Sequence, residues 1–402
     1  MFQGALEGVK VVEYATMVSG PYCGKLLADL GADVIKVEPP GGDPSRLCGP
    51  FPEDKKHPEK SALFLYNNTS KRGITLDLMK AEGLEILKKL LQWADVFIDN
   101  NPVDYFENLK LNWDALQQLN SGLICASITP YGRTGPRARV KGDELTLVHA
   151  GGIGFHLPAR SADIDRAPVK MGGYQVGYHG GLTAALAVMG LLLGKLKTGR
   201  GHLVDIALQQ VVLTLVCPLV TSSRYNDHSY SRVPDRPPGM GRMETSDGYV
   251  VLGAADDHHF RAFRELMGKP EWAASDEWDD MVWRANHMMD IAPQLDNWMK
   301  AQKKKDITQR ASKAGIPIGS VNTAEDVMNY VQYKARNYFV EVEHPVAGKY
   351  LYAGWPYKMA ASPPKVSRPA PLLGQHNEEV YCQVLGYSKK EFKRLRDIQV
   401  IT

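Results

Sequence analysis

Short apolar runs alternate with stretches of helical spacing along residues 1–130. Apolar and β-branched residues cluster at 9–13, 32–37, 94–98 and 123–128, and helical spacing is present at 21–30 and 80–93. Strands that alternate with helices form a parallel sheet with helices on both faces, joined by right-handed crossovers. The pattern therefore predicts an α/β fold built on a parallel sheet.

The rest of the chain contains a change of pattern. Residues 141–217 are glycine-rich with helical character, and residues 221–242 are rich in Ser, Arg, Pro and Gly without an apolar period. Beyond them we expect strands near 249–253, 316–322 and 338–342, helices up to 314, and a final helix near 378–385. Because 402 residues exceed what one core usually serves, we expect a large domain in 1–220, a small domain in 221–330, and a return to the large domain in 331–402.

The longest apolar run, residues 180–194, has 15 residues and ends at Lys195. A bilayer span needs about 20 residues, so this run favours a buried or interface helix. The N-terminus lacks the basic and apolar regions of a signal peptide. We therefore expect a soluble, cytoplasmic protein without a membrane partner.

Composition narrows the classes of partner and cofactor. The 48 Lys and Arg against 45 Asp and Glu leave a net charge of +3. This excess of positive charge is too small to indicate nucleic-acid binding. The five cysteines stand singly without CxxC pairs, which indicates a reducing compartment and argues against disulfides and a zinc site. The Asp-Asp-His-His run at 256–259 cannot direct four consecutive ligands at one ion, so we expect a helix start there and no metal.

Several segments, in one order from end to end, are similar to the class III coenzyme A transferases. The first is VVEYATMVSGPYCGKLLADLGADVIKVEPPGGDPSR at residues 11–46. The others are SKRGITLDL (70–78), ADVFIDN (94–100), SITPYGRTGP (127–136), TGRGHLVDIAL (198–208), GIPIGSVNTAEDV (315–327), FVEVEHPVAG (339–348) and SPPKVSRPAPLLGQH (362–376). On these motifs the chain is identified as a member of that family.

The resemblance implies a large Rossmann-like α/β domain built from both chain ends, a smaller inserted α+β domain, and an interlocked dimer. It also implies transfer of CoA between carboxylic acids, with acyl-CoA as substrate and no metal, redox group or covalently bound cofactor. In the family, an aspartate attacks the donor thioester to give a mixed anhydride, and the returning CoA thiolate then gives an aspartyl-CoA thioester. The acceptor carboxylate attacks that thioester, so this is covalent catalysis, with glycine-loop N–H groups stabilising the tetrahedral intermediates.

The chain departs from the family at that aspartate. The segments Pro-Val-Lys-Met-Gly (168–172) and Gly-Leu-Thr-Ala-Ala-Leu (181–186) match its two flanks without a gap, and counting between them puts Gly177 in its place. No Asp or Glu occurs between Arg166 and Val204. Since glycine has no side chain, we expect the chain to carry no catalytic residue of its own.

The racemase branch of the family offers no replacement. It pairs its aspartate with a histidine after the Gly-Pro turn, where this chain reads Lys-Gly-Asp-Glu at 141–144. We interpret His149 and His179 as packing residues or partners of backbone hydrogen bonds. Tyr174 and Tyr178 flank the vacant position, but a phenol does not replace an anhydride-forming carboxylate.

The resemblance implies CoA binding for four residues. Lys71, Arg72 and Lys141 match basic residues of the family that approach the CoA phosphates. Asn100 matches the first residue of an Asn-Phe-Arg-Pro-Gly stretch, but residues 101–104 lack its aromatic ring and its arginine. Removing one charge-assisted hydrogen bond costs about 1.5–3 kcal/mol. We therefore expect weakened CoA binding, and we expect that Gly177→Asp alone does not create a good enzyme.

Three functions remain open. The first is the non-catalytic subunit of a heteromeric class III CoA-transferase of the benzylsuccinate type, whose related partner subunit carries the aspartate. It would move CoA from succinyl-CoA to an aryl-substituted dicarboxylic acid such as (R)-benzylsuccinate, in anaerobic toluene degradation. The second is a stand-alone acyl-CoA isomerase or hydratase with Asp143 or Glu144 as its base, which needs a raised carboxyl pKa in a dry pocket. The third is an acyl-CoA-binding protein without catalysis, and we favour the first.

Overall fold

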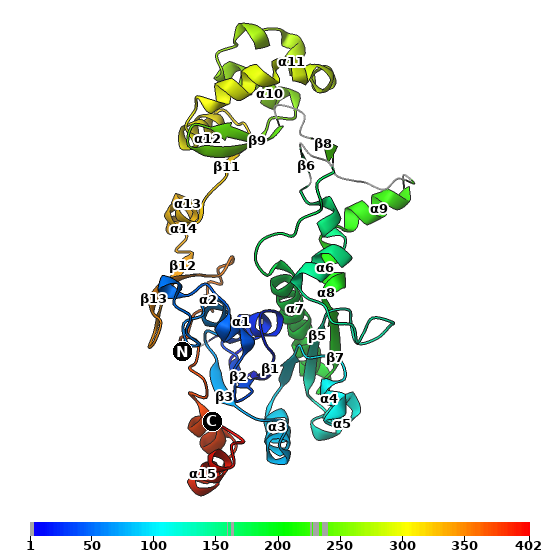
Figure 1. Ribbon diagram of the computed structural model, residues 1–402, viewed down its shortest axis with the longest axis vertical. Coiled ribbons are helices and arrows are strands. Elements are labelled where there is room, and N and C mark those ends of the chain that lie inside the picture. The colour runs from blue at the N-terminus through cyan, green and yellow to red at the C-terminus, as the bar shows by residue number, and fades with distance from the viewer. Residues whose placement is uncertain (1–3, 159, 162–164, 226, 228–232, 235–239) are drawn as a thin grey trace. The chain divides into compact units, whose positions relative to one another are not determined.

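The computed structural model describes residues 4–158, 160–161, 165–225, 227, 233–234 and 240–402 (Figure 1). They form two compact units with separate cores. The larger unit holds the described residues of Met1–Leu157, Pro168–Tyr230 and Tyr338–Thr402, and the smaller unit holds those of Pro158–Ala167 and Ser231–Asn337. The larger unit is therefore built from both ends of the chain, as predicted.

Six parallel strands form the central sheet of the larger unit. They are β1 (Lys10–Tyr14), β2 (Asp33–Glu38), β3 (Arg72–Thr75), β4 (Val96–Asp99), β5 (Ile124–Thr129) and β7 (Leu203–Ala207). Their spatial order is β3-β2-β1-β4-β5-β7, and Val12 of β1 pairs with Ile35 on one side and Phe97 on the other. This is the doubly wound order of Rossmann-like folds, so the predicted fold class is confirmed.

Helices cover both faces of this sheet (Figure 1). Successive residues of a strand point to opposite faces. Accordingly Val11 packs with α1 (Ser19–Asp29) and α7 (Gln175–Thr198), whereas Val12 packs with α3 (Ala81–Trp93). Each strand thus contributes to two cores, which explains why the strands read as continuous apolar runs.

The apolar run at 180–194 forms the centre of α7, a 24-residue helix that lies against α1. Gly181 allows this close approach, because a Cβ there would lie 2.5 Å from the carbonyl oxygen of Ser19. By length and composition alone α7 could cross a membrane, as could no other helix among the described residues, and 33% of its most apolar stretch is buried. The predicted packing helix is therefore present, with much of its surface exposed.

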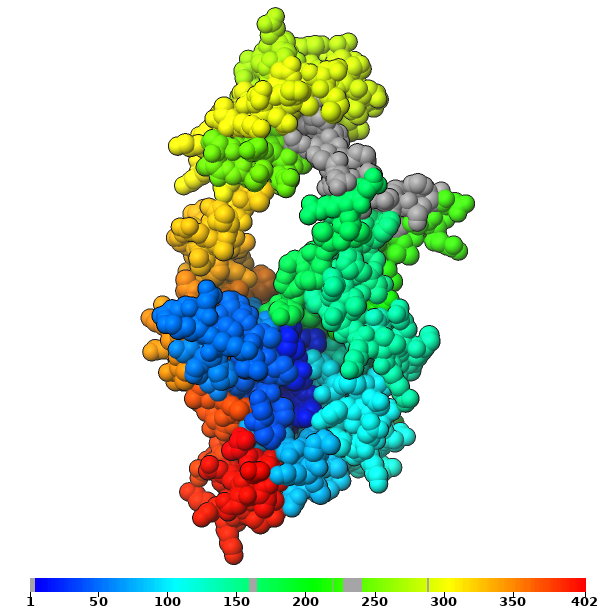
Figure 2. Space-filling model, viewed as in Figure 1, coloured from blue at the N-terminus to red at the C-terminus, as the bar shows by residue number. Residues whose placement is uncertain are grey.

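The C-terminal segment binds to edge strand β3. Gly73 N–H donates to His376 Nδ1 at 3.0 Å, Thr75 N–H donates to Asn377 Oδ1 at 2.9 Å, and the Tyr381 hydroxyl donates to Thr75 O at 2.8 Å. Figure 2 shows this segment, coloured orange to red, against the blue N-terminal segment. These bonds cover an edge that would otherwise expose unpaired backbone groups.

The final predicted helix near 378–385 is a π-helical turn, η6 (Glu379–Val384), and a further helix follows it, α15 (Lys389–Asp397). The apolar pattern did not indicate α15, because only Phe392 and Leu395 of its nine residues are apolar. The larger unit also contains η1 (Pro44–Leu47), η2 (Pro52–Asp54), α2 (Ala62–Asn67), α4 (Tyr105–Asn108), α5 (Trp113–Leu119), α6 (Glu144–Ala150), η3 (Ile153–His156), α8 (Leu208–Thr214), α9 (Cys217–Tyr225) and the antiparallel hairpin β12 (Phe339–His344) and β13 (Gly348–Ala353).

The smaller unit combines an antiparallel sheet with helices, which agrees with the predicted inserted α+β domain. The sheet has the order β11-β10-β9, and Phe260, Phe263 and Leu295 belong to its core. Its elements are β9 (Met240–Thr245), β10 (Gly248–Gly253), α10 (Asp257–Leu266), η4 (Glu271–Ala273), η5 (Asp276–Asp279), α11 (Met281–Lys300), α12 (Lys304–Lys313), β11 (Ile318–Ser320), α13 (Ala324–Asn329), α14 (Val331–Ala335) and the paired two-residue strands β6 (Arg160–Ser161) and β8 (Val233–Pro234).

Candidate functional site

The candidate site lies at the carboxyl ends of β1 and β4. The chain leaves these neighbouring strands toward opposite edges of the sheet, and in doubly wound folds ligands bind at such a switch point. Asn100, which follows β4, binds the loop that follows β1. Its Oδ1 accepts from Thr16 N–H at 2.9 Å, and its Nδ2 donates to Thr16 O at 2.7 Å and Ser19 Oγ at 3.1 Å. Asn100, predicted to contact CoA, thus holds the β1–α1 loop in place.

A buried ionic cluster also holds the loop between β1 and α1. The Lys36 ammonium donates to Glu13 Oε1 at 3.1 Å, Asp43 Oδ2 at 2.9 Å and Ala15 O at 2.9 Å. Met17, whose φ of 62° is uncommon for a residue other than glycine, donates its N–H to Asp43 Oδ1 at 3.1 Å. Burial alone would lower the pKa of Lys36, but Asp43 and Glu13 outweigh burial and raise it. The lysine therefore stays charged and the loop is held rigidly.

Lys71 belongs to the same cluster. Its fully buried ammonium lies 2.7 Å from Glu13 Oε2 and donates to Pro21 O at 2.7 Å and Asn68 Oδ1 at 2.8 Å. Burial lowers the pKa of Lys71 to about 8, against the opposing effect of Glu13. Its predicted contact with a CoA phosphate stays a prediction, and it requires these internal bonds to open.

The other two basic residues that are predicted to bind CoA phosphates differ in their exposure to solvent. Arg72 is 8% exposed, and its guanidinium pairs with Asp33 at 2.6 Å and with Glu379 at 3.0 Å. Lys141 is exposed in the loop before α6. Of the three, Lys141 is the one whose ammonium can reach a phosphate without breaking an ion pair given by this structure.

Gly177, predicted to stand in the place of the family aspartate, lies in the first turn of α7 against the β1–α1 loop. A Cβ at Gly177 would lie 2.9 Å from the Val18 Cβ and 3.0 Å from the Val18 Cγ1. Val18 is 3% exposed and sits in the loop that Asn100 and Asp43 fix. The space that a side chain at position 177 needs is therefore filled by a valine that has little freedom to move.

A carboxylate nevertheless lies against the backbone of Gly177. Glu144, the first residue of α6, accepts from Val176 N–H at 2.8 Å and from Gly177 N–H at 3.3 Å. Tyr174, the N-cap of α7, makes no side-chain capping bond. Glu144 therefore caps α7 from a neighbouring helix, where a carboxylate stabilises the free N–H groups. Sequence spacing gave no signal for this cap.

Asp143 has a different role. It is the N-cap of α6 and forms a capping box, in which its Oδ1 accepts from Thr146 N–H at 2.8 Å. The Thr146 N–H and hydroxyl hold the pKa of Asp143 below its ordinary value. A general base for an isomerase or hydratase at neutral pH needs the opposite shift, so Asp143 does not suit that role.

Aromatic and histidine side chains surround Gly177. The ring of Tyr178 packs edge-on against Tyr22, with centroids 4.9 Å apart, and lies 6.4 Å from the ring of Tyr66. His179 Nδ1 lies 2.7 Å from Gln175 O, which agrees with its interpretation as a backbone hydrogen-bond partner. These rings fill space beside α7 and add no carboxylate.

Asn101 serves the sheet in this structure. Its Nδ2 donates to Tyr14 O at 2.9 Å, and its N–H donates to Asp99 Oδ1 at 2.9 Å. Burial raises the pKa of Asp99 to about 6, although the Asn101 N–H opposes this shift. Where the family resemblance implies an aromatic ring over the nucleotide, an amide here ties β4 to β1.

Three of the four residues at 256–259 lie close together, although the sequence analysis argued that all four cannot face one ion. Ligand-type atoms of Asp256, His258 and His259 lie within 4.8 Å of one another at the start of α10 in the smaller unit. The N-terminal end of a helix favours carboxylates and opposes a cation. The absence of a metal there stays a prediction.

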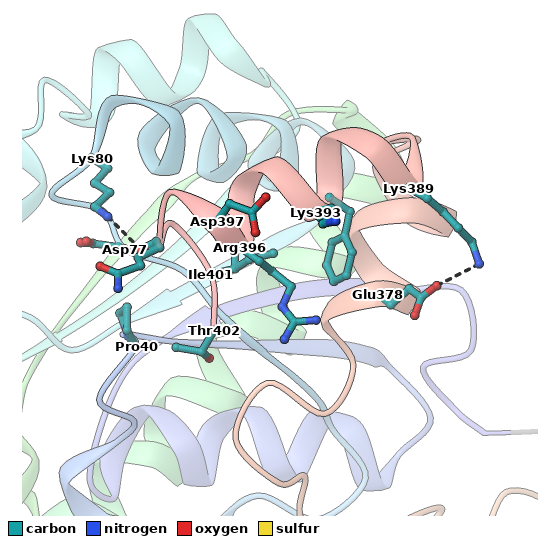
Figure 3. A pocket seen from close by; sticks show the side chains of 12 residues that line it. Pro40, Asp77, Lys80, Glu378, Lys389, Lys393, Arg396, Asp397, Ile401 and Thr402 are labelled. Carbon is teal, nitrogen blue, oxygen red and sulfur yellow. Dashed lines mark hydrogen bonds and ion pairs between the residues drawn. The ribbon is translucent and has the colours of Figure 1, made fainter.

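A cavity of about 1140 Å³ lies apart from the switch point (Figure 3). Its lining carries both charge signs, with Lys389 paired to Glu378 at 3.3 Å and Lys80 donating to Ile398 O at 2.6 Å. The lining residues follow β2 and β3 or belong to the C-terminal segment; they are Pro40, Asp77, Lys80, Glu378, Lys389, Phe392, Lys393, Arg396, Asp397, Gln399, Ile401 and Thr402. None comes from the loops after β1 and β4, so we do not assign this cavity to the site.

Substitution at Gly177 should reveal the contact with Val18. We expect Gly177→Asp to lower the free energy of unfolding by about 1–3 kcal/mol, because overpacking forces neighbours to shift. Gly190→Ala in the same helix is the matched control, since a Cβ there meets nothing within 4 Å and should stabilise α7 by about 1 kcal/mol. Urea titration of these variants, with Val18→Ala combined in a double-mutant cycle, measures the coupling. Additive effects of Val18→Ala and Gly177→Asp would contradict the packing argument.

Asp99 should make stability depend on pH. Its folded pKa of about 6 lies above the ordinary 3.8, so the native carboxyl keeps a proton that the unfolded chain releases. The stability from Asp99 is therefore present below about pH 4 and is lost as pH rises through about 6. The free energy of unfolding of the wild type, minus that of Asp99→Asn, should fall by up to about 3 kcal/mol between about pH 4 and 7. Asp114→Asn, at an exposed aspartate, is the control, and pH curves that run parallel for the wild type and Asp99→Asn would refute the shift.

Comparison with known proteins identifies the family. The model of CoA-transferase family III matches residues 6–377. The chain is 29% identical over 406 residues to the succinyl-CoA–D-citramalate CoA-transferase of Chloroflexus aurantiacus, covering 98% of each chain. It is 29% identical over 414 residues to the succinyl-CoA–L-malate CoA-transferase beta subunit of the same organism, again covering 98% of each.

A solved structure agrees with this match. A CAIB/BAIF family protein from Brucella suis superposes with a TM-score of 0.85 at 29% identity, covering 95% of this chain and 100% of that chain. Both the sequence match and the structural match extend over nearly the whole chain. The protein belongs to CoA-transferase family III.

Proposed function

We propose that this chain is the non-catalytic subunit of a heteromeric CoA-transferase. The observation that carries the proposal is the packing of Val18 against Gly177, which leaves no room for a nucleophile at the position where the family resemblance implies an aspartate. The family match over residues 6–377 supports retention of the scaffold. A scaffold without its nucleophile can still complete the fold or the site of a related subunit.

The proposed partner is a related subunit that carries the aspartate, interlocked with this chain. One relative is named as a beta subunit, so enzymes of more than one subunit occur among the similar proteins. The apolar face of α7 offers surface for such a partner, because four of its leucines are more than half exposed: Leu182, Leu186, Leu193 and Leu196. Covering this surface with a second chain would remove apolar area from water.

The proposed reaction moves CoA from succinyl-CoA to an aryl-substituted dicarboxylic acid such as (R)-benzylsuccinate, in the cytoplasm and as part of anaerobic toluene degradation. The names of the citramalate and malate relatives support the use of succinyl-CoA and a dicarboxylic acceptor. The partner's aspartate attacks the thioester carbonyl and releases CoA thiolate, which then attacks the resulting anhydride and releases succinate. The acceptor carboxylate attacks the aspartyl thioester and displaces CoA thiolate, which leaves a mixed anhydride of the acceptor and the aspartate. The thiolate then attacks the acceptor carbonyl of this anhydride, forms the new thioester and releases the aspartate as a carboxylate.

Within this reaction we assign binding of CoA to four residues of the chain. Lys141 is exposed and offers its ammonium to a phosphate, and Asn100 positions the β1–α1 loop. Lys71 and Arg72 are paired inside the protein, and we propose that CoA competes for them only if those ion pairs open. Weak binding of CoA to the isolated chain follows from this arrangement.

A second candidate is a stand-alone acyl-CoA isomerase or hydratase with Glu144 as the base. The observation that favours it is the position of the Glu144 carboxylate against Gly177 N–H at 3.3 Å. Against it, both oxygens of Glu144 accept backbone N–H groups, so the carboxylate is already engaged in capping α7.

Reconstitution tests the proposal. The chain, a related chain with aspartate at the position of Gly177, and their mixture are each assayed with succinyl-CoA and (R)-benzylsuccinate, following benzylsuccinyl-CoA. We expect no turnover by this chain alone. We expect the turnover rate of the mixture to exceed that of either chain by at least about a hundredfold, because this chain lacks the nucleophile and the related chain alone lacks the subunit that completes its site.

Turnover by this chain alone would contradict the proposal. In that case Glu144→Gln, with Asp143→Asn as the neighbouring control, decides the second candidate. Loss of activity in Glu144→Gln but not in Asp143→Asn would assign the base to Glu144.

A further inference from the structure

The larger unit has a second cavity, of about 550 Å³, beside the hairpin β12–β13. Pro50, Phe51 and Pro52 form one wall, Leu65 and Tyr66 of α2 form the next, and residues 350–353 of β13 close it. This volume falls within the range of about 300–1,000 Å³ that is typical of small-molecule sites.

The lining of this cavity is aromatic and aliphatic. Tyr350 is 46% exposed and lies on the same face of β13 as Tyr352, so aromatic surface faces solvent inside a concavity. The inner wall is built before any ligand arrives, because Tyr352 packs on the buried pair Phe64 and Leu65. Preformed apolar concavities of this kind bind apolar groups with little loss of conformational entropy.

One cation lies in this apolar lining. Lys60 is the only charged residue of the cavity, and no acidic partner of its ammonium occurs among the described residues. Its neighbour Glu59 is already paired with Arg46 at 2.6 Å. A lysine whose stem lies on apolar surface and whose ammonium is unpaired fits a carboxylate attached to an apolar group.

The cavity shares a wall with the candidate site. Tyr66 lines the cavity on one side, and on the other its ring centroid lies 6.4 Å from that of Tyr178, the residue after Gly177. The neighbouring Asn67 Nδ2 donates to the Tyr178 hydroxyl at 3.4 Å. A molecule in the cavity would therefore lie next to the α7 terminus that the site uses.

We propose that this cavity binds an aryl-substituted carboxylic acid, with the ring among Phe51, Tyr66 and Tyr350 and the carboxylate at Lys60. The inference rests on the proposed CoA transfer for its biological meaning, and it assigns the acceptor to acids that carry an aromatic ring. Small aliphatic acids leave the apolar walls uncovered and gain little from them.

Binding to the full-length chain tests this without turnover. Isothermal titration compares 3-phenylpropanoate with propanoate, which keeps the carboxylate and lacks the ring. We expect measurable binding of 3-phenylpropanoate only, weakened about tenfold or more by Tyr350→Asp and by Lys60→Gln, since each removes one of the two contacts. Lys60→Arg should retain binding, and Lys56→Gln, at an exposed lysine nearby, is the matched control. Both substituted positions lie at the cavity surface, and far-UV circular dichroism verifies folding.

Equal binding of the two acids, no binding of either, or unchanged affinity in Tyr350→Asp would overturn the proposal. A change of oligomeric mass in Tyr350→Asp with unchanged affinity would assign the cavity to a protein interface and overturn it as well. The titration needs no catalytic partner, so it still tests binding to the cavity if the proposed CoA transfer fails. Conversely, transfer that persists in the mixture while the titration fails would refute the cavity alone.

Discussion

Lys36 holds the loop on which the whole candidate site depends. Its buried ammonium joins Glu13, Asp43 and the Ala15 carbonyl, and Asp43 in turn accepts from Met17 N–H. An unpaired charge at such depth costs several kcal/mol, so the cluster tolerates few alternative arrangements. Fixing residues 15–17 in this way also fixes Val18, and Val18 decides what position 177 can hold.

As a consequence, the loops and the helix of the site are present, but there is no space for a side chain at Gly177. Val18 occupies the side-chain space at Gly177, and Glu144 satisfies the N–H groups that a helix terminus would otherwise offer to an anion. Asn101 ties β4 to β1. These contacts support one another, so a change at Gly177 alone leaves the valine and the cap in place.

The sequence predicted the sheet well because buried parallel strands leave continuous apolar runs, as at 123–128, where the structure has Ile124–Thr129. It missed α15, whose stability comes from the Ser388 cap and Leu395 rather than from an apolar stripe. It singled out Lys71 and Arg72 as a basic pair, whose CoA binding stays a prediction, but it did not indicate their partners. Glu13 and Asp33, which neutralise Lys71 and Arg72, lie far away in the sequence and only folding brings them together. The Glu144 cap was hidden for the same reason.

The central claim is that this chain holds no nucleophile and depends on a related subunit. Intact-mass spectrometry after incubation with succinyl-CoA tests it most directly, on the purified chain and on its mixture with a relative that carries aspartate at the position of Gly177. We predict a succinyl or CoA adduct on the relative and none on this chain in either sample. An adduct on this chain by itself would contradict the account and direct the search for a nucleophile to Glu144.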